Sequence, residues 1–312
     1  MRTVFMGAGD IGLPALRWLL NSSSCEIIGV YTQPDRPVGR KQVLTPPEVK
    51  KVALEAGVPV FQPEKLREES AMTQLRELAP ELIVVMAYGQ ILSKEVIDLP
   101  TIACINLHAS ILPRHRGASP IQGAIRDGDE ESGITVMYID EGLDSGDILL
   151  IERCPIEPTD TGGTLHDKLA DIAPTALAQA ITKFETGKAP RIQQDESLVT
   201  HDRKLLREHG EIDWSQSAEA IARMVRAYDP WPSAYTTING QKLKILPFCN
   251  VLKTSEGEPG EIVSTNGGNL FVSCGEGQII VREVQLEGRK RMDVVSFLAG
   301  NSELARVGAK FS

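Results

Sequence analysis

Short apolar segments alternate with segments of helical periodicity between residues 3 and 184, and this alternation constrains the fold more than any other feature of the sequence. The strand-like segments are residues 3–6, 26–31, 82–86, 103–107 and 134–139. The helical segments are residues 13–20, 48–56, 73–78, 119–126 and 164–184. Apolar strands that alternate with helices are typical of a mainly parallel sheet with helices on both faces. The pattern therefore predicts a doubly wound α/β domain.

A different pattern begins after Lys188, where the sequence becomes polar and loses its periodicity. Residues 190–207 are interpreted as an interdomain linker. One helix is predicted at 217–227, followed by short strand-like runs separated by turns such as Asn239-Gly240. The length of 312 residues also favours two domains, because a single hydrophobic core usually stops growing near ~250–300 residues. We expect a Rossmann-like domain over residues 1–189 and a small OB-like β-barrel or a sandwich over residues 208–312.

Charge and cysteine content limit the class of protein. The formal net charge is −9, of which residues 1–206 carry −8 and residues 207–312 carry −1. Neither part has the basic excess of a simple nucleic-acid-binding domain, so such binding must depend on local patches. The sequence has neither an apolar run of the ~18 residues that indicate a membrane span nor a secretory signal, which predicts a cytoplasmic protein without a membrane partner. Five scattered cysteines without a C-x-x-C pair predict reduced thiols.

The turn after the first predicted strand resembles a dinucleotide-binding fingerprint. Gly7-Ala8-Gly9-Asp10-Ile11-Gly12 follows a strand and opens a helix, as G-x-G-x-x-G does in nicotinamide-binding folds. That fingerprint also needs an acidic residue at the end of the second strand to bind the ribose. Here that strand ends in Tyr31-Thr32-Gln33-Pro34, and Asp35 comes late, in a proline-bounded loop. We infer that a tight turn requires these glycines and that no dinucleotide binds there.

The end of the strand at 103–107 carries the clearest indication of chemistry. Asn106 and His108 are two residues apart, so on a strand both side chains lie on one face. They stand at the carboxyl end of the strand, where open α/β sheets bind ligands. A single histidine here is adequately explained by a hydrogen bond to a backbone carbonyl. However, a glycine-bearing turn at residues 143–147 could bring Asp144 to His108, which makes the three residues a candidate catalytic set.

The string from Cys104 to Pro120, together with residues 142–148, resembles the folate-dependent formyltransferase family. That family carries an Asn-x-His pair, a Ser-Leu-Leu-Pro loop and a Leu-Asp-Thr-Gly-Asp turn. Residues 33–40 (QPDRPVGR), 194–213 leading into Trp214, and 229–235 (DPWPSAY) extend the resemblance over nearly the whole chain. The arginine-rich early stretch is most similar to the members that act on methionyl initiator tRNA.

The sequence departs from the family pattern at a few positions. Ala109 replaces a glycine, Ile111 replaces a leucine, and the early turn reads Gly-Ala-Gly-Asp where the family has Gly-Thr-Pro-Glu. After Arg40 stand Lys41-Gln42-Val43 in place of Gly-Lys-Lys. The last change removes positive charge from a loop that, in the family, enters the tRNA acceptor stem.

The resemblance implies a formyl transfer from 10-formyltetrahydrofolate to the α-amino group of methionyl initiator tRNA, for translation initiation. It implies catalytic roles for Asn106, His108 and Asp144. It implies folate contacts by a loop of four residues, namely Ser110, Ile111, Leu112 and Pro113. The basic residues with which we expect tRNA contacts are Arg36, Arg40, Lys41, Arg203 and Lys204. We expect a monomer.

The three candidate residues suit acyl transfer to an amine. A free α-amino group has a pKa of ~7.7–8.0, so part of it is already neutral near pH 7. His108 can take the proton that leaves the amine, and Asp144 can orient its ring. The amide of Asn106 can stabilise the oxyanion, a role worth about 3–4 kcal/mol of barrier. No metal is required, and the five histidines lack the spacing of a ligand cluster.

Two other functions stay open from the residues alone. A formyltransferase for amino sugar nucleotides has a small acceptor, so it does not need the basic stretch of residues 36–41. A folate- or nucleotide-binding module without catalysis belongs to another class, and the intact set of Asn106, His108 and Asp144 argues against it.

Overall fold

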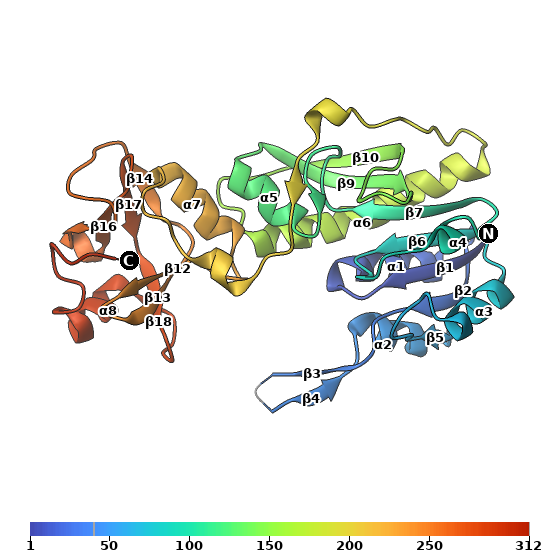
Figure 1. Ribbon diagram of the computed structural model, residues 1–312, viewed down its shortest axis with the longest axis horizontal. Helices are drawn as coiled ribbons and strands as arrows, with labels where there is room; N and C mark the ends of the chain where they lie inside the picture. The colour runs from blue at the N-terminus through green and yellow to red at the C-terminus, as the bar shows by residue number, and fades with distance from the viewer. Residues whose placement is uncertain (40, 312) are drawn as a thin grey trace. The chain divides into compact units, whose positions relative to one another are not determined.

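The computed structural model describes residues 1–39 and 41–311, and the chain forms two compact units (Figure 1). The first unit comprises Met1–Gly117, Ser132–Cys154 and His166–Asp202. The second unit comprises Ala118–Glu131, Pro155–Leu165 and Arg203–Ser312. Two short segments that precede residue 166 thus belong to the second unit. No helix among the described residues is long and apolar enough to span a bilayer.

The first unit is built on one seven-stranded sheet. In spatial order its strands are β10 (Ile148–Pro155), β9 (Glu131–Tyr138), β7 (Ala103–His108), β6 (Leu82–Met86), β1 (Arg2–Gly7), β2 (Glu26–Tyr31) and β5 (Val60–Phe61). The pairs β1–β2, β1–β6, β2–β5 and β6–β7 are parallel, whereas β9 runs antiparallel to β7. The predicted mainly parallel, doubly wound sheet is confirmed. The predicted strands are all present, and β5 and β10 are additional edge strands.

Four helices predicted from the sequence, together with one additional short helix, accompany this sheet. They are α1 (Leu13–Asn21), α2 (Glu48–Glu55), α3 (Glu69–Leu78), the short α4 (Lys94–Ile97) and the long α6 (Gly162–Glu185), whose first residues belong to the second unit. The apolar side of α3, with Met72 and Leu75, packs in one cluster with Val4 on β1 and with Ile83 and Val85 on β6. Burial of these side chains stabilises the unit by about 1.5–3 kcal/mol each.

The second unit has its own core and an antiparallel architecture. One sheet has the order β12 (Tyr235–Ile238), β13 (Gln241–Ile245), β18 (Glu283–Leu286) and β19 (Met292–Asp293). The other has the order β14 (Asn250–Leu252), β17 (Gln278–Val281), β16 (Leu270–Ser273) and β15 (Ile262–Ser264). Its helices are α5 (Pro120–Asp127), α7 (Ala218–Ala227) and α8 (Val294–Asn301). The core includes Trp214 stacked on Phe311, with ring centroids 5.4 Å apart. The predicted small β unit in the C-terminal part is confirmed.

The early arginine-rich stretch, which the sequence suggested to be a loop, forms a two-stranded antiparallel ribbon (Figure 1). Its strands are β3 (Arg36–Val38) and β4 (Val43–Thr45). At its base, the carboxylate of Asp35 accepts hydrogen bonds from Lys50 Nζ at 2.8 Å and Gln62 Nε2 at 2.7 Å. These bonds fix the start of the ribbon to the body of the first unit.

The glycine-rich turn after β1 has a packing explanation. A Cβ atom on Gly7 would lie 2.7 Å from the ring of Phe5 and 2.9 Å from the carbonyl oxygen of Met86. Only glycine therefore fits between these neighbours. The second strand ends at Tyr31 and leads into the buried Thr32, and Asp35 is paired with Lys50.

We predict that NAD⁺ and NADP⁺ do not bind saturably to this protein. The turn meets the spacing of the fingerprint, but β2 offers no carboxylate at its end for the ribose. Isothermal titration calorimetry up to millimolar dinucleotide should show only heats of dilution. A micromolar dissociation constant would contradict the packing interpretation.

Candidate active site

The first two residues of the candidate site stand on β7. Asn106 is half-buried and lies in register with Val85 on β6 and Met137 on β9. His108, the last residue of the strand, is buried and exposes only 6% of its surface. Its Nε2–H donates a hydrogen bond of 2.9 Å to the backbone carbonyl of His115. The sheet thus fixes the backbone of both residues, and the carbonyl of His115 fixes the ring of His108.

The third residue comes from the turn between β9 and β10. Asp144 has a φ of 50°, in the left-handed region that non-glycine residues rarely adopt. Its Oδ2 lies 3.7 Å from His108 Nδ1 and accepts a hydrogen bond of 2.8 Å from the N–H of Gly117. The structure therefore places Asp144 beside His108, on the side of the ring opposite to His115.

These contacts decide which nitrogen of His108 can take part in proton transfer. A carbonyl oxygen only accepts hydrogen bonds, so Nε2 must carry a hydrogen atom. In the neutral ring Nδ1 then holds the free electron pair. A proton taken up at Nδ1 would be stabilised by the neighbouring carboxylate of Asp144. The arrangement can therefore accept and release one proton at Nδ1.

The loop after β7 is held by hydrogen bonds of its own and by the hydroxyl of Thr135 on β9. Ser110 Oγ donates to the carbonyl of Arg114 at 2.8 Å, and Thr135 Oγ1 bridges the carbonyl of Ser110 and the N–H of Leu112. Both Ser110 and Leu112 are buried, and Leu112 belongs to a small core cluster with Met137 and Ile148. Of the four residues expected to contact folate, Ile111 and Pro113 retain partly exposed side chains.

The segment predicted as an interdomain linker makes hydrogen bonds to the residues around the candidate site. We call residues 190–202 the strap. Within it, Gln194 donates to the carbonyls of Asp144 and Gly146 at 2.9 and 2.8 Å, and accepts from the guanidinium of the buried Arg116. That guanidinium also donates to Glu196 and holds the pKa of its carboxyl group below the usual range. Sequence reasoning did not assign a site role to Arg116 or Gln194.

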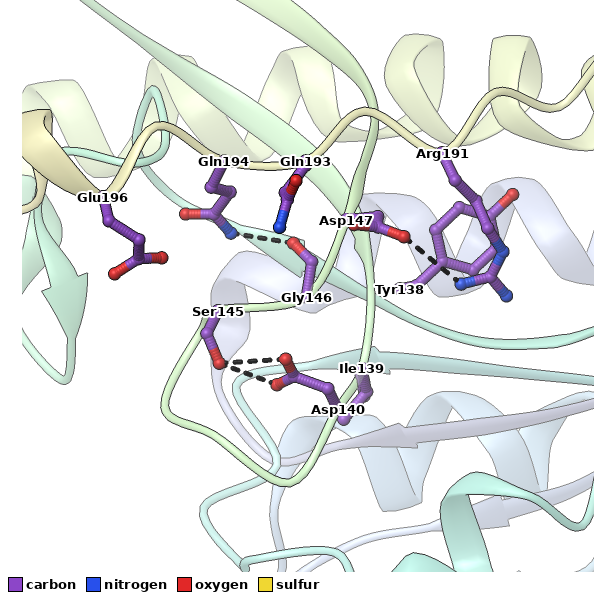
Figure 2. A pocket seen from close by; sticks show the side chains of 10 residues that line it. All are labelled: Tyr138, Ile139, Asp140, Ser145, Gly146, Asp147, Arg191, Gln193, Gln194 and Glu196. Carbon is purple, nitrogen blue, oxygen red and sulfur yellow. Dashed lines mark hydrogen bonds and ion pairs between the residues drawn. The ribbon is translucent and has the colours of Figure 1, made fainter.

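A polar cavity of about 220 Å³ lies between the strap and the Asp144 turn (Figure 2). In Figure 2 Arg191 lies over the ring of Tyr138, 3.7 Å from its centroid, and reaches Asp147 at the same distance. Burial raises the pKa of the Tyr138 hydroxyl. The other residues that line the cavity are Ile139, Asp140, Ser145, Gly146, Gln193, Gln194 and Glu196. The cavity is smaller than the ~300–1,000 Å³ of pockets that bury a whole organic ligand, so it suits one part of a ligand.

Two other kinds of chemistry have little support in the described residues. Cys104 lies on β7 two residues before Asn106, but burial raises the pKa of its thiol to about 12, so it is not a thiolate at neutral pH. Within residues 1–39 and 41–311, no three His, Cys, Asp or Glu side chains are grouped as a metal site.

The residues expected to contact tRNA are distributed over both units. Arg36 and Lys41 are exposed on and beside the β3–β4 ribbon of the first unit. Arg40 lies outside the described residues. Arg203 and Lys204 are exposed at the beginning of the last segment of the second unit.

We predict that Gly117→Ala destabilises the first unit by about 2–4 kcal/mol, because a Cβ there adds both overpacking and backbone strain. Gly117 has a φ of 115°, and a Cβ would lie 2.4 Å from the carbonyl oxygen of Asp202 in the strap. Urea denaturation measures the change in the free energy of unfolding. Gly187→Ala is the matched control, since Gly187 also has a positive φ (65°) but open space around it. Equal losses in the two variants would contradict the proposed close contact.

Comparison with known proteins shows which family this chain resembles. The protein family described as "Formyl transferase" matches this chain over residues 1–181. The family described as "Formyl transferase, C-terminal domain" matches it over residues 204–302. The methionyl-tRNA formyltransferase of Akkermansia muciniphila is 52% identical over 309 residues, which cover 97% of this chain and 98% of that protein. The enzyme of the same name from Marinobacter nauticus is 43% identical over the full length of both chains.

Solved structures show the same fold at low sequence identity. The N-formyltransferase from Helicobacter canadensis, solved with folinic acid and dTDP-3-aminofucose, has a TM-score of 0.66 and is 18% identical. The match covers 90% of this chain and 98% of that one. Two family matches that together span most of the chain, and relatives of high identity along its whole length, show that this chain belongs to the formyl transferase family.

Proposed function

We propose that this protein transfers the formyl group of 10-formyltetrahydrofolate to the α-amino group of methionyl initiator tRNA. The observation that carries the proposal is the buried His108 beside Asp144, 3.7 Å apart, in a chain of this family. The relatives named methionyl-tRNA formyltransferase are 43–52% identical over nearly the whole chain. In a bacterial cell such a product would serve translation initiation.

The proposed reaction makes one C–N bond and breaks another. The neutral amine nitrogen of the acceptor attacks the formyl carbon, and the carbonyl oxygen becomes an oxyanion in the tetrahedral intermediate. The amide group of Asn106 donates a hydrogen bond to this oxyanion. His108 Nδ1 takes the proton released by the amine and returns it to the nitrogen that leaves the formyl carbon, so that no net proton is consumed. Asp144 stabilises the imidazolium between these two steps.

The surroundings of the turn fit a folate-derived donor. The cavity beside it exposes carboxylate and amide groups of Asp140, Gln193 and Glu196, which are suitable acceptors for the N–H groups of a pterin ring. The partly exposed Ile111 and Pro113 offer apolar surface on the loop after β7. We propose that Ser110 and Leu112 act on the donor indirectly, by holding this loop in shape.

The acceptor is the point at which two candidate functions differ. A sugar-nucleotide acceptor is suggested by the N-formyltransferase from Helicobacter canadensis, but a chain 18% identical shares only the fold. The 52% identical relative is named for methionyl-tRNA. The β3–β4 ribbon favours the larger acceptor, since it carries the exposed cations Arg36 and Lys41 on a projection that a small molecule does not need.

One assay separates the candidates. Purified protein is incubated with 10-formyltetrahydrofolate and one of three acceptors, namely methionyl initiator tRNA, methionyl elongator tRNA or an amino sugar nucleotide. The proposal requires that kcat/KM is highest for the initiator tRNA. Preferential formylation of the sugar nucleotide would replace it with the second candidate, and transfer to none of the three would favour a binding module.

We predict that Asn106→Ala, His108→Ala and Asp144→Asn each reduce kcat by about 10²–10³-fold, the usual effect of removing an oxyanion donor or a general base. The His108→Ala/Asp144→Asn double variant should lose much less than the product of the single effects, because both residues act on the same proton. Single-turnover formylation measures these rates. Cys104→Ala, on the same strand, is the control and should retain turnover. A single variant with wild-type kcat would remove that residue from the mechanism.

We predict that the Arg36→Ala/Lys41→Ala double variant raises KM for tRNA at least tenfold and leaves folate affinity nearly unchanged. Contacts from cations to phosphates depend on counterion release, so the wild-type KM for tRNA should also rise steeply with salt and the variant should show a smaller slope. Arg17→Ala/Lys65→Ala removes the same charge from other exposed positions of the first unit and serves as the control. Equal effects of the two double variants would exclude a specific role of the ribbon.

A further inference from the structure

A second histidine–aspartate pair, His115 and Asp202, lies next to the candidate site. His115 Nδ1 is 2.7 Å from Asp202 Oδ2, and the two side chains are only 2% and 3% exposed. Removing charged groups from water is costly, and a buried pair of this kind often stabilises a fold less than apolar residues of the same size. Neither residue lines the cavity beside the Asp144 turn. The pair therefore calls for an explanation other than stability.

The backbone of His115 connects this pair to the catalytic candidates. Its carbonyl oxygen accepts the hydrogen bond from His108 Nε2, at 2.9 Å. Its N–H donates to Thr200 Oγ1 in the strap, at 2.8 Å. The side chain of His115 is bound to Asp202, also in the strap. The strap thus contacts His115 through both its backbone and its side chain, and His115 contacts His108.

The conformation of His115 needs such support. Its φ of 62° lies in the left-handed region, which costs a non-glycine residue roughly 1–2 kcal/mol. A rotation of the peptide after His115 toward an ordinary conformation would turn its carbonyl away from His108. The pairing of β8 (Arg116–Gly117) with β11 (His201–Asp202) opposes this rotation, because it places Asp202 in register with Gly117.

The strand β8 also contacts Asp144. The N–H of Gly117 donates to Asp144 Oδ2, the oxygen that faces His108 Nδ1. The backbone of residues 115–117 therefore contacts both members of the catalytic pair, one through a carbonyl and the other through an N–H. A shift of this backbone would alter the two contacts together.

We propose that Asp202 is a positioning residue for formyl transfer, which acts through His115 and together with Thr200. By holding the carbonyl of His115 on His108 Nε2, it keeps the hydrogen atom on Nε2 and leaves Nδ1 as the nitrogen that exchanges a proton beside Asp144. This inference rests on the proposed function, because it assigns Asp202 a part in the same proton transfer.

The test uses the full chain and two variants of the strap. Asp202→Asn keeps the size of the side chain and removes its charge, and Thr200→Val removes the acceptor of the His115 N–H. We expect kcat for methionyl initiator tRNA to fall about 10²-fold in Asp202→Asn, as small displacements of catalytic groups do, with KM for folate changed less than threefold. Thr200→Val should show the same pattern to a smaller extent. Asp202→Glu, which restores the carboxylate, should recover part of kcat.

Nitrogen NMR of the histidine rings provides a readout that needs no substrate. In the wild-type protein the signals of His108, assigned by their loss in His108→Gln, should show the hydrogen atom on Nε2. In Asp202→Asn they should show a mixture of the two neutral tautomers. Asp167→Asn is the control, since Asp167 Oδ1 binds His166 Nδ1 at 3.0 Å in an exposed pair on α6. It should change neither kcat nor the His108 signals.

The possible outcomes separate this inference from the proposed function. Wild-type protein that does not formylate methionyl initiator tRNA contradicts the proposed function, while the tautomer of His108 still tests the positioning role. An active wild type, with Asp202→Asn unchanged in kcat and in the His108 signals, overturns the inference alone. The inference is also overturned if the loss of kcat in Asp202→Asn and Thr200→Val is fully accounted for by the fraction of each variant that is unfolded.

Discussion

The hydrogen bond from His108 Nε2 to the carbonyl of His115 is the contact on which the site depends. It joins the last residue of a central strand to a loop that has no regular structure of its own. Because the carbonyl only accepts, this one bond determines the orientation of the imidazole and the nitrogen at which it can gain a proton. Asp144 can then support that nitrogen only from the opposite side, which is where its turn places it.

The residue that accepts this bond, His115, is itself in contact with the strap through Thr200 and Asp202. Residues that are far apart in the sequence, Arg116 and Gln194, connect the loop after β7 to the turn of Asp144 through side-chain and backbone hydrogen bonds. The strap also pairs with residues 116–117 as a short parallel strand. A polar segment can in this way join the loop after β7 to the turn of Asp144. Its polar composition follows from that role, since the bonds it makes are to backbone carbonyls, a guanidinium and an imidazole.

Two glycines that stand in different sequence contexts are both required by close packing. The glycines of residues 7–12 match a cofactor fingerprint, yet Gly7 is required by the ring of Phe5 and the carbonyl of Met86. Gly117 was not part of the cofactor fingerprint, yet its small size lets the strap approach within contact distance of the loop. Spacing alone could not separate these cases, because what a glycine is needed for depends on the atoms beside it.

The sequence by itself determined the strand and helix order, the mainly parallel sheet and the small β unit, because apolar periodicity reflects which side of each element is buried. It also singled out Asn106, His108 and Asp144, since two of them share one strand face and the third lies in a glycine-bearing turn. Only the tertiary structure decided that residues 36–38 and 43–45 pair as a ribbon and that Gln194 and Asp202, in a segment of polar composition, are buried. These features depend on partners up to 87 residues away, as in the His115–Asp202 contact, and local sequence patterns carry no information about such partners.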